Sequence, residues 1–319
     1  MKPTFKLVAL LGVLVVAGST TLWLCRPHGQ PRQVAAVTPQ TIGTNLARAA
    51  IPRASAKPGK PPVAPDAVPE SVRSIVAAPA ITFAARVKAV RALPANLAPQ
   101  EIHALHAYLL TPASSSAEDR EQENWLRNEL LDKLADAAEL PAELAGVLVA
   151  IYQDPAQDIV MRDYAVQHVT PVYARTSAEE KATLQQILWS AVAETDSSLA
   201  GTALLALRDL ATDHREIQAN KLGEAALKLA GDTHCGELSR ITAFQLCARL
   251  GLTQAAPLLL QQAQMTESVP LQLAAIAALG DVGNAEARTY LRQLAVQPEP
   301  RLRPALDTAL KKLNQRLGI

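Results

Sequence analysis

The sequence predicts an all-α protein whose main part is a right-handed α-solenoid of antiparallel helix pairs. Three observations predict this fold: an apolar pattern that repeats along the chain, helix boundary signals between the repeats, and a composition rich in small aliphatic residues. Aromatic residues make up only 3% of the 319 residues, whereas apolar residues make up 49%. Thin helical layers can be filled with Ala and Leu, which also have high helix propensity.

The apolar pattern consists of a small or apolar residue, an apolar residue four positions later, and a third residue three positions after that. Its first residues lie 31 to 40 positions apart in successive copies. This period is typical of stacked helical hairpins. The six copies are Leu130, Leu134 and Ala137; Ala165, Val169 and Val172; Ala203, Leu207 and Leu210; Ala243, Cys247 and Leu250; Ala275, Leu279 and Val282; and Leu306, Leu310 and Leu313.

Helix boundary signals fall between the apolar segments. Ser177 and Glu180 have the spacing of a capping box, directly before an apolar run that begins at Leu184. Gly251 and Gly283 are predicted to end helices at equivalent points of two repeats. Four prolines of this region lie in gaps or in first helical turns, where a missing N–H is tolerated: Pro155, Pro257, Pro270 and Pro298.

The first 25 residues are predicted to be a signal anchor or a signal peptide. Lys2 and Lys6 precede an uncharged apolar run from 7 to 24, with Trp23 near its end. That run is long enough to cross a bilayer as a helix, which favours an uncleaved anchor. Its small residues Ala17 and Ser19 also fit signal cleavage, so secretion after cleavage is the alternative.

Residues 26–80 are predicted to be a disordered, basic tether rich in Pro and Ala. They contain ten of the 22 prolines and no Phe, Tyr or Trp. Such a segment buries too little apolar surface to offset the entropy of ordering it. Residues 81–319 therefore form the predicted solenoid. We expect this body to lie outside the cytoplasm, at the inner membrane and periplasm of a bacterium.

Charge is distributed unevenly along the chain, although the net charge is only +1. Residues 26–80 carry seven Lys and Arg against two acidic residues, whereas residues 81–319 carry 22 basic and 28 acidic residues. Nucleic acid is usually bound by clustered Lys and Arg. The acidic body therefore argues against a nucleic-acid partner.

Parts of the body resemble HEAT-like repeats, especially the short bacterial form that is also found in phycobilisome lyases. The resemblance is carried by AAIAALGDVG and AEARTYLRQLA within 267–297, by 239–263 and by 301–313. It covers about 230–316 well and 120–230 more weakly. These repeats often place an acidic residue four positions before an Arg, a spacing kept by Asp158 and Arg162 and by Glu299 and Arg303. Glu237 and Arg240 are only three apart, and Gln272 stands where an Arg is expected.

Residues with possible chemistry are few and scattered. Glu101, His103 and His106 share one side of a predicted helix, but solvated polar residues explain them better than a metal site. Cys247 occupies a core position of its repeat, too far from Cys235 for a disulfide if a helix begins near Glu237. No catalytic motif is present in the body, so we expect neither catalytic residues nor a cofactor or metal.

The sequence therefore favours a non-catalytic, membrane-tethered scaffold or adaptor that binds another protein. HEAT-like stacks usually present their second helices on the concave side, which is where we expect the partner. The predicted partner-binding residues are Lys181, Gln185, Lys221, Glu224, Lys228, Arg288 and Arg292. The alternative is a HEAT-like enzyme or ligand carrier of the chromophore-lyase type. The walls of its chromophore pocket would be formed by Trp125, Tyr164, Tyr173 and Trp189.

Overall fold

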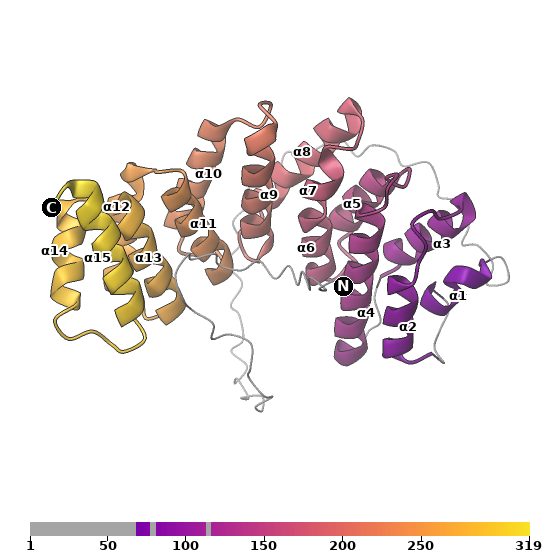
Figure 1. Cartoon of the computed structure of the whole chain (residues 1–319), viewed down its shortest axis with the longest axis horizontal. Coiled ribbons are helices and arrows are strands. Elements are labelled where there is room, and N and C mark those ends of the chain that lie inside the picture. The colour runs from indigo at the N-terminus through magenta and orange to yellow at the C-terminus, as the bar shows by residue number, and fades with distance from the viewer. Residues whose placement is uncertain (1–67, 77–80, 113–115) are drawn as a thin grey trace, which may run out of the picture. The chain divides into compact units, whose positions relative to one another are not determined.

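The protein is described by a computed structural model for residues 68–76, 81–112 and 116–319. All regular secondary structure in these ranges is helical, and the helices stack into an α-solenoid (Figure 1). This confirms the predicted fold class. The apolar run at 7–24 and most of the predicted tether lie outside the described residues. Within the described ranges, no helix is both long and apolar enough to span a membrane.

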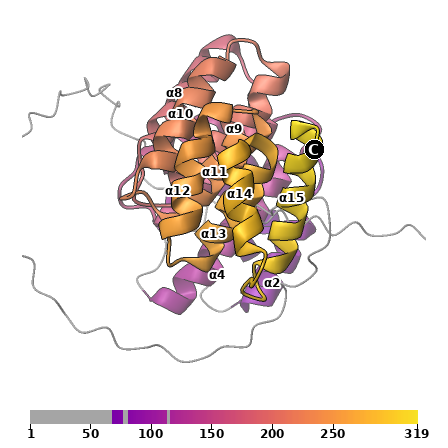
Figure 2. The same cartoon turned by 90° about the vertical axis from the view of Figure 1, so that its left-hand side faces the viewer.

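The contacts between the helices arrange them in two rows along the stack, which Figure 2 shows from its C-terminal end. Successive helices of the first row pack side by side along the stack. Each helix of the second row that follows α4 packs closely on the first-row helix that comes next in the chain. The first row contains α2 (Phe83–Arg91), α4 (Ala117–Ala135), α6 (Ile159–Gln167), α7 (Val169–Tyr173), α9 (Leu199–Asp213), α11 (Glu237–Arg249), α13 (Val269–Val282) and α15 (Arg303–Leu317). The second row contains α1 (Glu70–Val76), α3 (Pro99–Leu110), α5 (Leu144–Gln153), α8 (Ala178–Val192), α10 (Ala219–Gly231), α12 (Ala256–Met265) and α14 (Ala285–Leu294).

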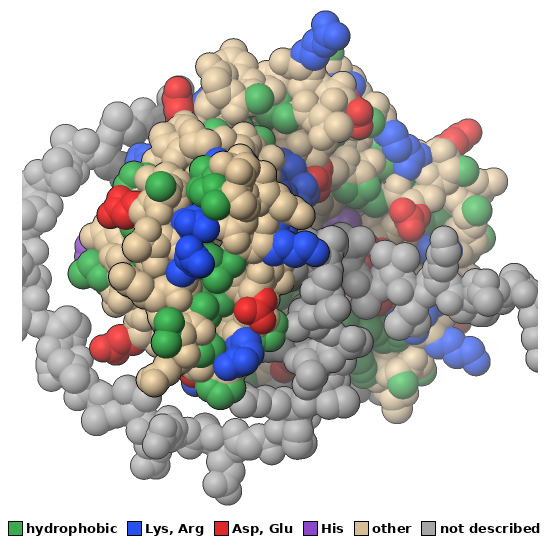
Figure 3. Space-filling view, turned by 60° about the vertical axis from the view of Figure 1, so that its left-hand side comes forward, with side chains coloured by type: hydrophobic (Ala, Val, Ile, Leu, Met, Phe, Trp, Pro, Cys, Tyr) green, Lys and Arg blue, Asp and Glu red, His purple; other side chains and the backbone are tan. Residues whose placement is uncertain are grey.

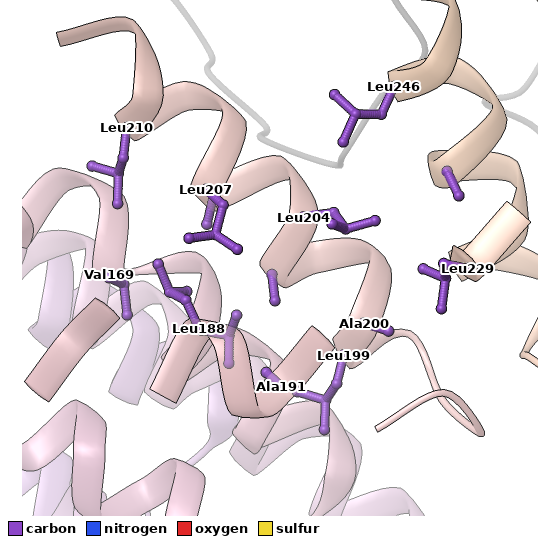
Figure 4. Packing of buried hydrophobic residues seen from close by; sticks show 14 of the residues in the cluster. Val169, Leu188, Ala191, Leu199, Ala200, Leu204, Leu207, Leu210, Leu229 and Leu246 are labelled. Atoms are coloured by element: carbon purple, nitrogen blue, oxygen red, sulfur yellow. The ribbon is translucent and has the colours of Figure 1, made fainter. Parts of the chain in front are cut away.

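The repeating apolar residues form the core between the rows. All eighteen are buried except Ala137, Leu250 and Leu310, which are half-buried. Figure 4 shows the arrangement around α9, where Leu207 and Leu210 lie on the side of Val169 and Leu188. Leu204 lies on the side of Leu246, which belongs to α11. Burial of this kind stabilises by roughly 25 cal/mol per Å² of apolar surface, so the core is the main source of stability.

Three helix boundaries confirm the sequence signals in detail. The Ser177 hydroxyl accepts a hydrogen bond from the N–H of Glu180, whose carboxylate accepts one from the N–H of Ser177 at 2.9 Å. Gly251 follows α11 with φ of +64°, the left-handed conformation that favours glycine. Gly283 also ends its helix, but with extended backbone. A Cβ there would lie 2.4 Å from the carbonyl oxygen of Leu279, so close approach requires this glycine.

The repeat that contains Ala165 has a divided first-row helix. A single helix through Val169 and Val172 was expected, but α6 ends at Gln167 and α7 begins at Val169. Pro171 explains the break. Its ring lacks an N–H and clashes with the carbonyl four residues earlier, which belongs to Gln167.

The folded body begins before the predicted boundary at residue 80. Helix α1 lies within the predicted tether, and it packs against α2 and α3. Val72 and Ile75 have no exposed surface. These apolar residues, three positions apart, supply the buried face that the Pro-rich composition of 26–80 as a whole does not suggest.

The C-terminal helix closes the stack. Leu306, Ala309 and Leu313 of α15 are buried, whereas Asp307 and Lys311 are exposed. Charged side chains are spread among apolar ones over this end of the molecule (Figure 3). A terminal repeat must cover its own apolar face, and the polar outer surface of α15 fits that role.

Candidate functional site

The predicted partner-binding residues all lie on second-row helices. Lys181 and Gln185 are on α8, Lys221, Glu224 and Lys228 on α10, and Arg288 and Arg292 on α14. The second row is the more loosely packed of the two in this half of the stack, because α8 and α10 make few close backbone contacts with each other. The residues are thus distributed over three helices.

Four of these side chains are engaged within the molecule. Lys181 lies over the ring of Tyr173, with its Nζ 5.6 Å from the centroid, and the Nζ of Lys221 lies 4.0 Å from the centroid of Trp189. Gln185 donates to the carbonyl of Glu216, and Arg288 donates to Asn314 at 2.6 Å. These contacts link neighbouring parts of the stack, and this structural role explains the four residues.

Of the residues considered for metal chemistry, Glu101 has a structural role. Glu101 accepts from the N–H of Ala98 at 2.7 Å and from the Ser71 hydroxyl, so it caps α3. His106 is buried and His103 is exposed. Among the residues that the structure describes, no group of three or more His, Cys, Asp or Glu is placed to hold a metal ion. Cys235 and Cys247 are both buried, unpaired thiols.

Asp158 and Arg162, which have the HEAT-like spacing, reach across repeats instead of pairing with each other. Asp158 accepts from Asn124 at 2.9 Å and lies 3.6 Å from Arg120, both on the preceding first-row helix. Arg162 donates to the Tyr152 carbonyl at the end of α5 and to Glu194 at 2.8 Å.

Gln272 takes over the role of the missing arginine. It donates to the Ala263 carbonyl near the end of α12 at 3.0 Å. It therefore preserves one of the contacts that Arg162 makes in its own repeat, although its amide provides fewer donors than a guanidinium.

Exposed apolar side chains gather on one edge of the stack, which sequence reasoning did not identify. This edge is formed by the last turns of second-row helices, the first turns of first-row helices, and the loops between them; in Figure 1 it is the lower edge from α2 to α15. Leu238, Met265 and Val296 are 67%, 72% and 78% exposed. We call this set the apolar edge: Ile81, Leu110, Ile159, Val160, Leu238, Met265 and Val296. Of the large apolar residues that are exposed in the described ranges, only Trp125 and Ile319 lie elsewhere.

Hydrogen bonds join successive loops of the apolar edge into one row. Ser198 donates to Asp163 of α6 at 3.0 Å, and the N–H of Gly236 donates to the Thr195 carbonyl at 2.7 Å. One loop further along, Ser268 donates to Glu237 at 2.7 Å. The loops are therefore held in register, so a partner would meet a fixed surface.

Ser239 provides a direct test of this row. Its buried hydroxyl donates to the Ser197 carbonyl at 2.8 Å and accepts from the N–H of Gly201 at 2.9 Å. We expect Ser239→Ala to lower the free energy of unfolding by about 2 kcal/mol, because two buried polar groups lose their partner. Urea denaturation measures the change. The control is Ser190→Ala at an exposed position of α8, where a change of only a few tenths of a kcal/mol is expected; equal losses would contradict the role of Ser239.

His168 lies between α6 and α7, and burial lowers its pKa to about 4. Its Nε2 is 3.0 Å from the Asn128 amide oxygen and 3.7 Å from Asp132. The unfolded chain binds a proton near the ordinary pKa of 6.5, whereas the folded chain does not. The contribution of His168 to the free energy of unfolding is thus fully present above pH 6.5 and is lost as the pH falls toward 4.

We expect this histidine to lower the free energy of unfolding by up to about 1.4 kcal/mol per pH unit below pH 6.5. Asp132 acts in the opposite direction, since burial and the charges of Glu129 and Asp136 raise its pKa to about 6. Comparing the native protein with His168→Gln isolates the histidine, because Asp132 is present in both. Urea denaturation from pH 7 to 4 should show a shallower decline in His168→Gln. The exposed His103→Gln serves as control, and a decline that His168→Gln leaves unchanged would refute the assignment.

Three of the four aromatic residues considered for the walls of a ligand pocket make separate packing contacts. Trp125 of α4 packs against Phe83, with ring centroids 5.4 Å apart, while Trp189 of α8 lies beneath Lys221. Tyr173 of α7 makes an edge contact with His214. The structure therefore explains each of these three rings by a local packing contact.

Comparisons with known proteins are limited to distant structural likeness. No family model matches the sequence, and no curated protein matches it. Human deoxyhypusine hydroxylase in complex with glycerol is 19% identical, with a TM-score of 0.36, over 79% of this chain and 97% of the other. A designed armadillo repeat protein is also 19% identical, with a TM-score of 0.36, over 72% of this chain and 99% of the other. At this level of similarity, the two likenesses carry no weight in assigning a function.

Proposed function

We propose that the protein is a non-catalytic scaffold that binds another protein through the apolar edge of its helical stack. The observation that carries this proposal is the location of the exposed apolar side chains. Single exposed apolar residues are common on protein surfaces, but a collection of them along one rigid edge is typical of an interaction site. The helical-repeat fold is suited to this role, because it offers an extended surface made of similar units.

The proposal includes a membrane tether. The apolar run at 7–24 anchors the chain, and the body lies outside the cytoplasm, at the inner membrane and periplasm of a bacterium. What supports this part is the sequence alone: the run has the length of a bilayer-spanning helix and follows two lysines. Secretion after cleavage of the leader is the alternative for this part.

The second-row residues are a weaker candidate for the binding site. Lys181, Gln185, Lys221 and Arg288 already make contacts inside the molecule. A partner would have to replace those contacts, which reduces the net gain on binding. The apolar edge presents exposed apolar side chains, whose burial by a partner is favourable.

The test is chemical crosslinking and mass spectrometry on intact membranes that contain the tagged full-length protein. Three forms are compared: the native protein, the edge variant Leu238→Ser/Met265→Ser, and the control variant Gln186→Ser/Gln261→Ser on exposed positions of α8 and α12. We expect crosslinks to one partner protein that are lost in the edge variant and retained in the control. Crosslinks that persist in the edge variant, or only self-links in the native protein, would contradict the proposed function.

A further inference from the structure

The loops of the apolar edge are uniformly acidic over a long stretch. Four consecutive loops with one or two residues of each adjoining helix, at 153–160, 193–199, 232–238 and 264–269, contain no Lys or Arg, and the nearest basic residues are Arg162 and Arg240. They contain these seven carboxylates: Asp154, Asp158, Glu194, Asp196, Asp232, Glu237 and Glu267. The body as a whole has a mixture of both signs, whereas these four consecutive loops on one edge carry acidic residues without Lys or Arg.

Most of these carboxylates form no ion pair with a Lys or Arg of the described chain. Asp158 and Glu194 lie within ion-pair distance of Arg120 and Arg162. The other five have no Lys or Arg within that distance in the part of the chain that the structure describes. Asp196 and Glu267 are exposed. Negative potential therefore remains along the row.

Exposed apolar side chains lie beside three of the four loops. Ile159 and Val160 adjoin the first of the four loops, Leu238 the third, and Met265 the fourth. Helices that pack side by side are about 8–10 Å apart, so four successive loops span roughly 30 Å. An extended segment of about nine residues covers that length at about 3.3 Å per residue.

We propose that these four loops bind a basic segment of a partner protein in which Lys or Arg alternate with apolar residues. The inference rests on the proposed scaffold function and names the chemistry of its partner. The cations meet the free carboxylates, and the apolar side chains cover Leu238, Met265 and their neighbours. Charge complementarity provides orientation and selectivity, while apolar burial provides most of the affinity.

The test uses a fluorescein-labelled peptide of twelve residues in which Lys and Leu alternate, with fluorescence anisotropy on the full-length protein. Two comparison peptides replace every Lys by Glu or every Leu by Ser. We expect the Lys–Leu peptide to bind at least about tenfold more tightly than either, with affinity that falls as salt rises. Equal binding of the Lys–Leu and Glu–Leu peptides would overturn the proposal, and so would equal binding of the Lys–Leu and Lys–Ser peptides.

Matched variants locate the binding site. Asp196→Asn/Glu267→Gln should weaken binding of the Lys–Leu peptide about threefold to tenfold, since two exposed charge interactions are lost. The control Asp213→Asn/Glu286→Gln removes two exposed carboxylates away from these loops and should leave binding unchanged. Equal weakening by both variants would overturn the assignment. Self-association of the protein that Leu238→Ser abolishes would assign the edge to a second copy and also overturn it.

The two levels of the account fail separately. A partner that is crosslinked at the edge in membranes, without any preference for the Lys–Leu peptide, would leave the scaffold function intact and remove the basic segment. If no partner is crosslinked at the edge, the proposed scaffold function is itself wrong, whether or not the Lys–Leu peptide binds.

Discussion

Replacing Glu123 by Gln is expected to lower the free energy of unfolding by about 3 kcal/mol. Glu123 of α4 accepts from Arg86 of α2 at 2.8 Å, from the Tyr108 hydroxyl of α3, and from Arg127 at 3.5 Å. The Arg127 side chain is only 2% exposed, and its Nε and Nη1 have no hydrogen-bond partner in the described part of the chain. The Glu123 carboxylate therefore balances a buried charge that an amide does not balance.

The pKa of Glu123 agrees with this role. Burial alone would raise it, but the hydrogen bonds from Arg86 and Tyr108 and the charges of the two arginines lower it below the usual value. Because the folded-state pKa is lowered, the contribution of Glu123 is present above its ordinary pKa and is lost as the pH falls through the lowered value.

Glu129→Gln is the matched control, because Glu129 also lies on α4 and also binds an arginine of α2. Its partner Arg91, at 2.9 Å, is 61% exposed, so a loss of no more than about 1 kcal/mol is expected. Urea denaturation of the full-length protein measures both variants. Similar losses for the two would show that Glu123 does not balance a buried charge.

Replacing Gly280 by Ala is expected to lower the free energy of unfolding by about 2 kcal/mol. A Cβ at this position of α13 would lie 2.8 Å from the Cα and 3.2 Å from the carbonyl oxygen of Ala309 in α15. Backbone atoms cannot rotate away, so the two helices would have to separate. Their close packing holds the last repeat on the stack.

Gly146→Ala tests the same substitution without the close contact. Gly146 is also within a helix, α5, but a Cβ there would meet nothing within 4 Å. Since Ala has the higher helix propensity, this change should stabilise the protein by about 0.5–1 kcal/mol. Both thermal and urea denaturation should therefore show a lower stability for Gly280→Ala and a higher stability for Gly146→Ala. Destabilisation by both, to the same extent, would contradict the close approach of α13 and α15.

The sequence predicted the core and the helix boundaries because both depend on local patterns. Positions such as Ala203, Leu207 and Cys247 recur at the spacing of a helix face, and each is buried. The Ser177 capping box depends on residues three positions apart. Patterns of this length are visible in the amino-acid sequence without knowledge of the fold.

Other features depend on pairs of residues that are distant in the sequence. Arg86 and Glu123 are 37 positions apart, and Ser239 meets Ser197 across 42 positions. Neither separation has a recognisable motif. The apolar edge was missed for a related reason: Leu238 and Met265 look like ordinary residues of their own helices, and only the antiparallel packing brings the ends of those helices to one edge.

The most direct test of the scaffold function is site-specific photocrosslinking in cells that carry the full-length protein. A benzoylphenylalanine side chain is placed at 238 or 265 on the apolar edge, or at 186 or 261 on exposed positions of the second row. We predict a discrete adduct with one partner protein from positions 238 and 265 and none from positions 186 and 261. Adducts from the second-row positions alone, or from none of the four, would contradict the assignment of the apolar edge as the binding site.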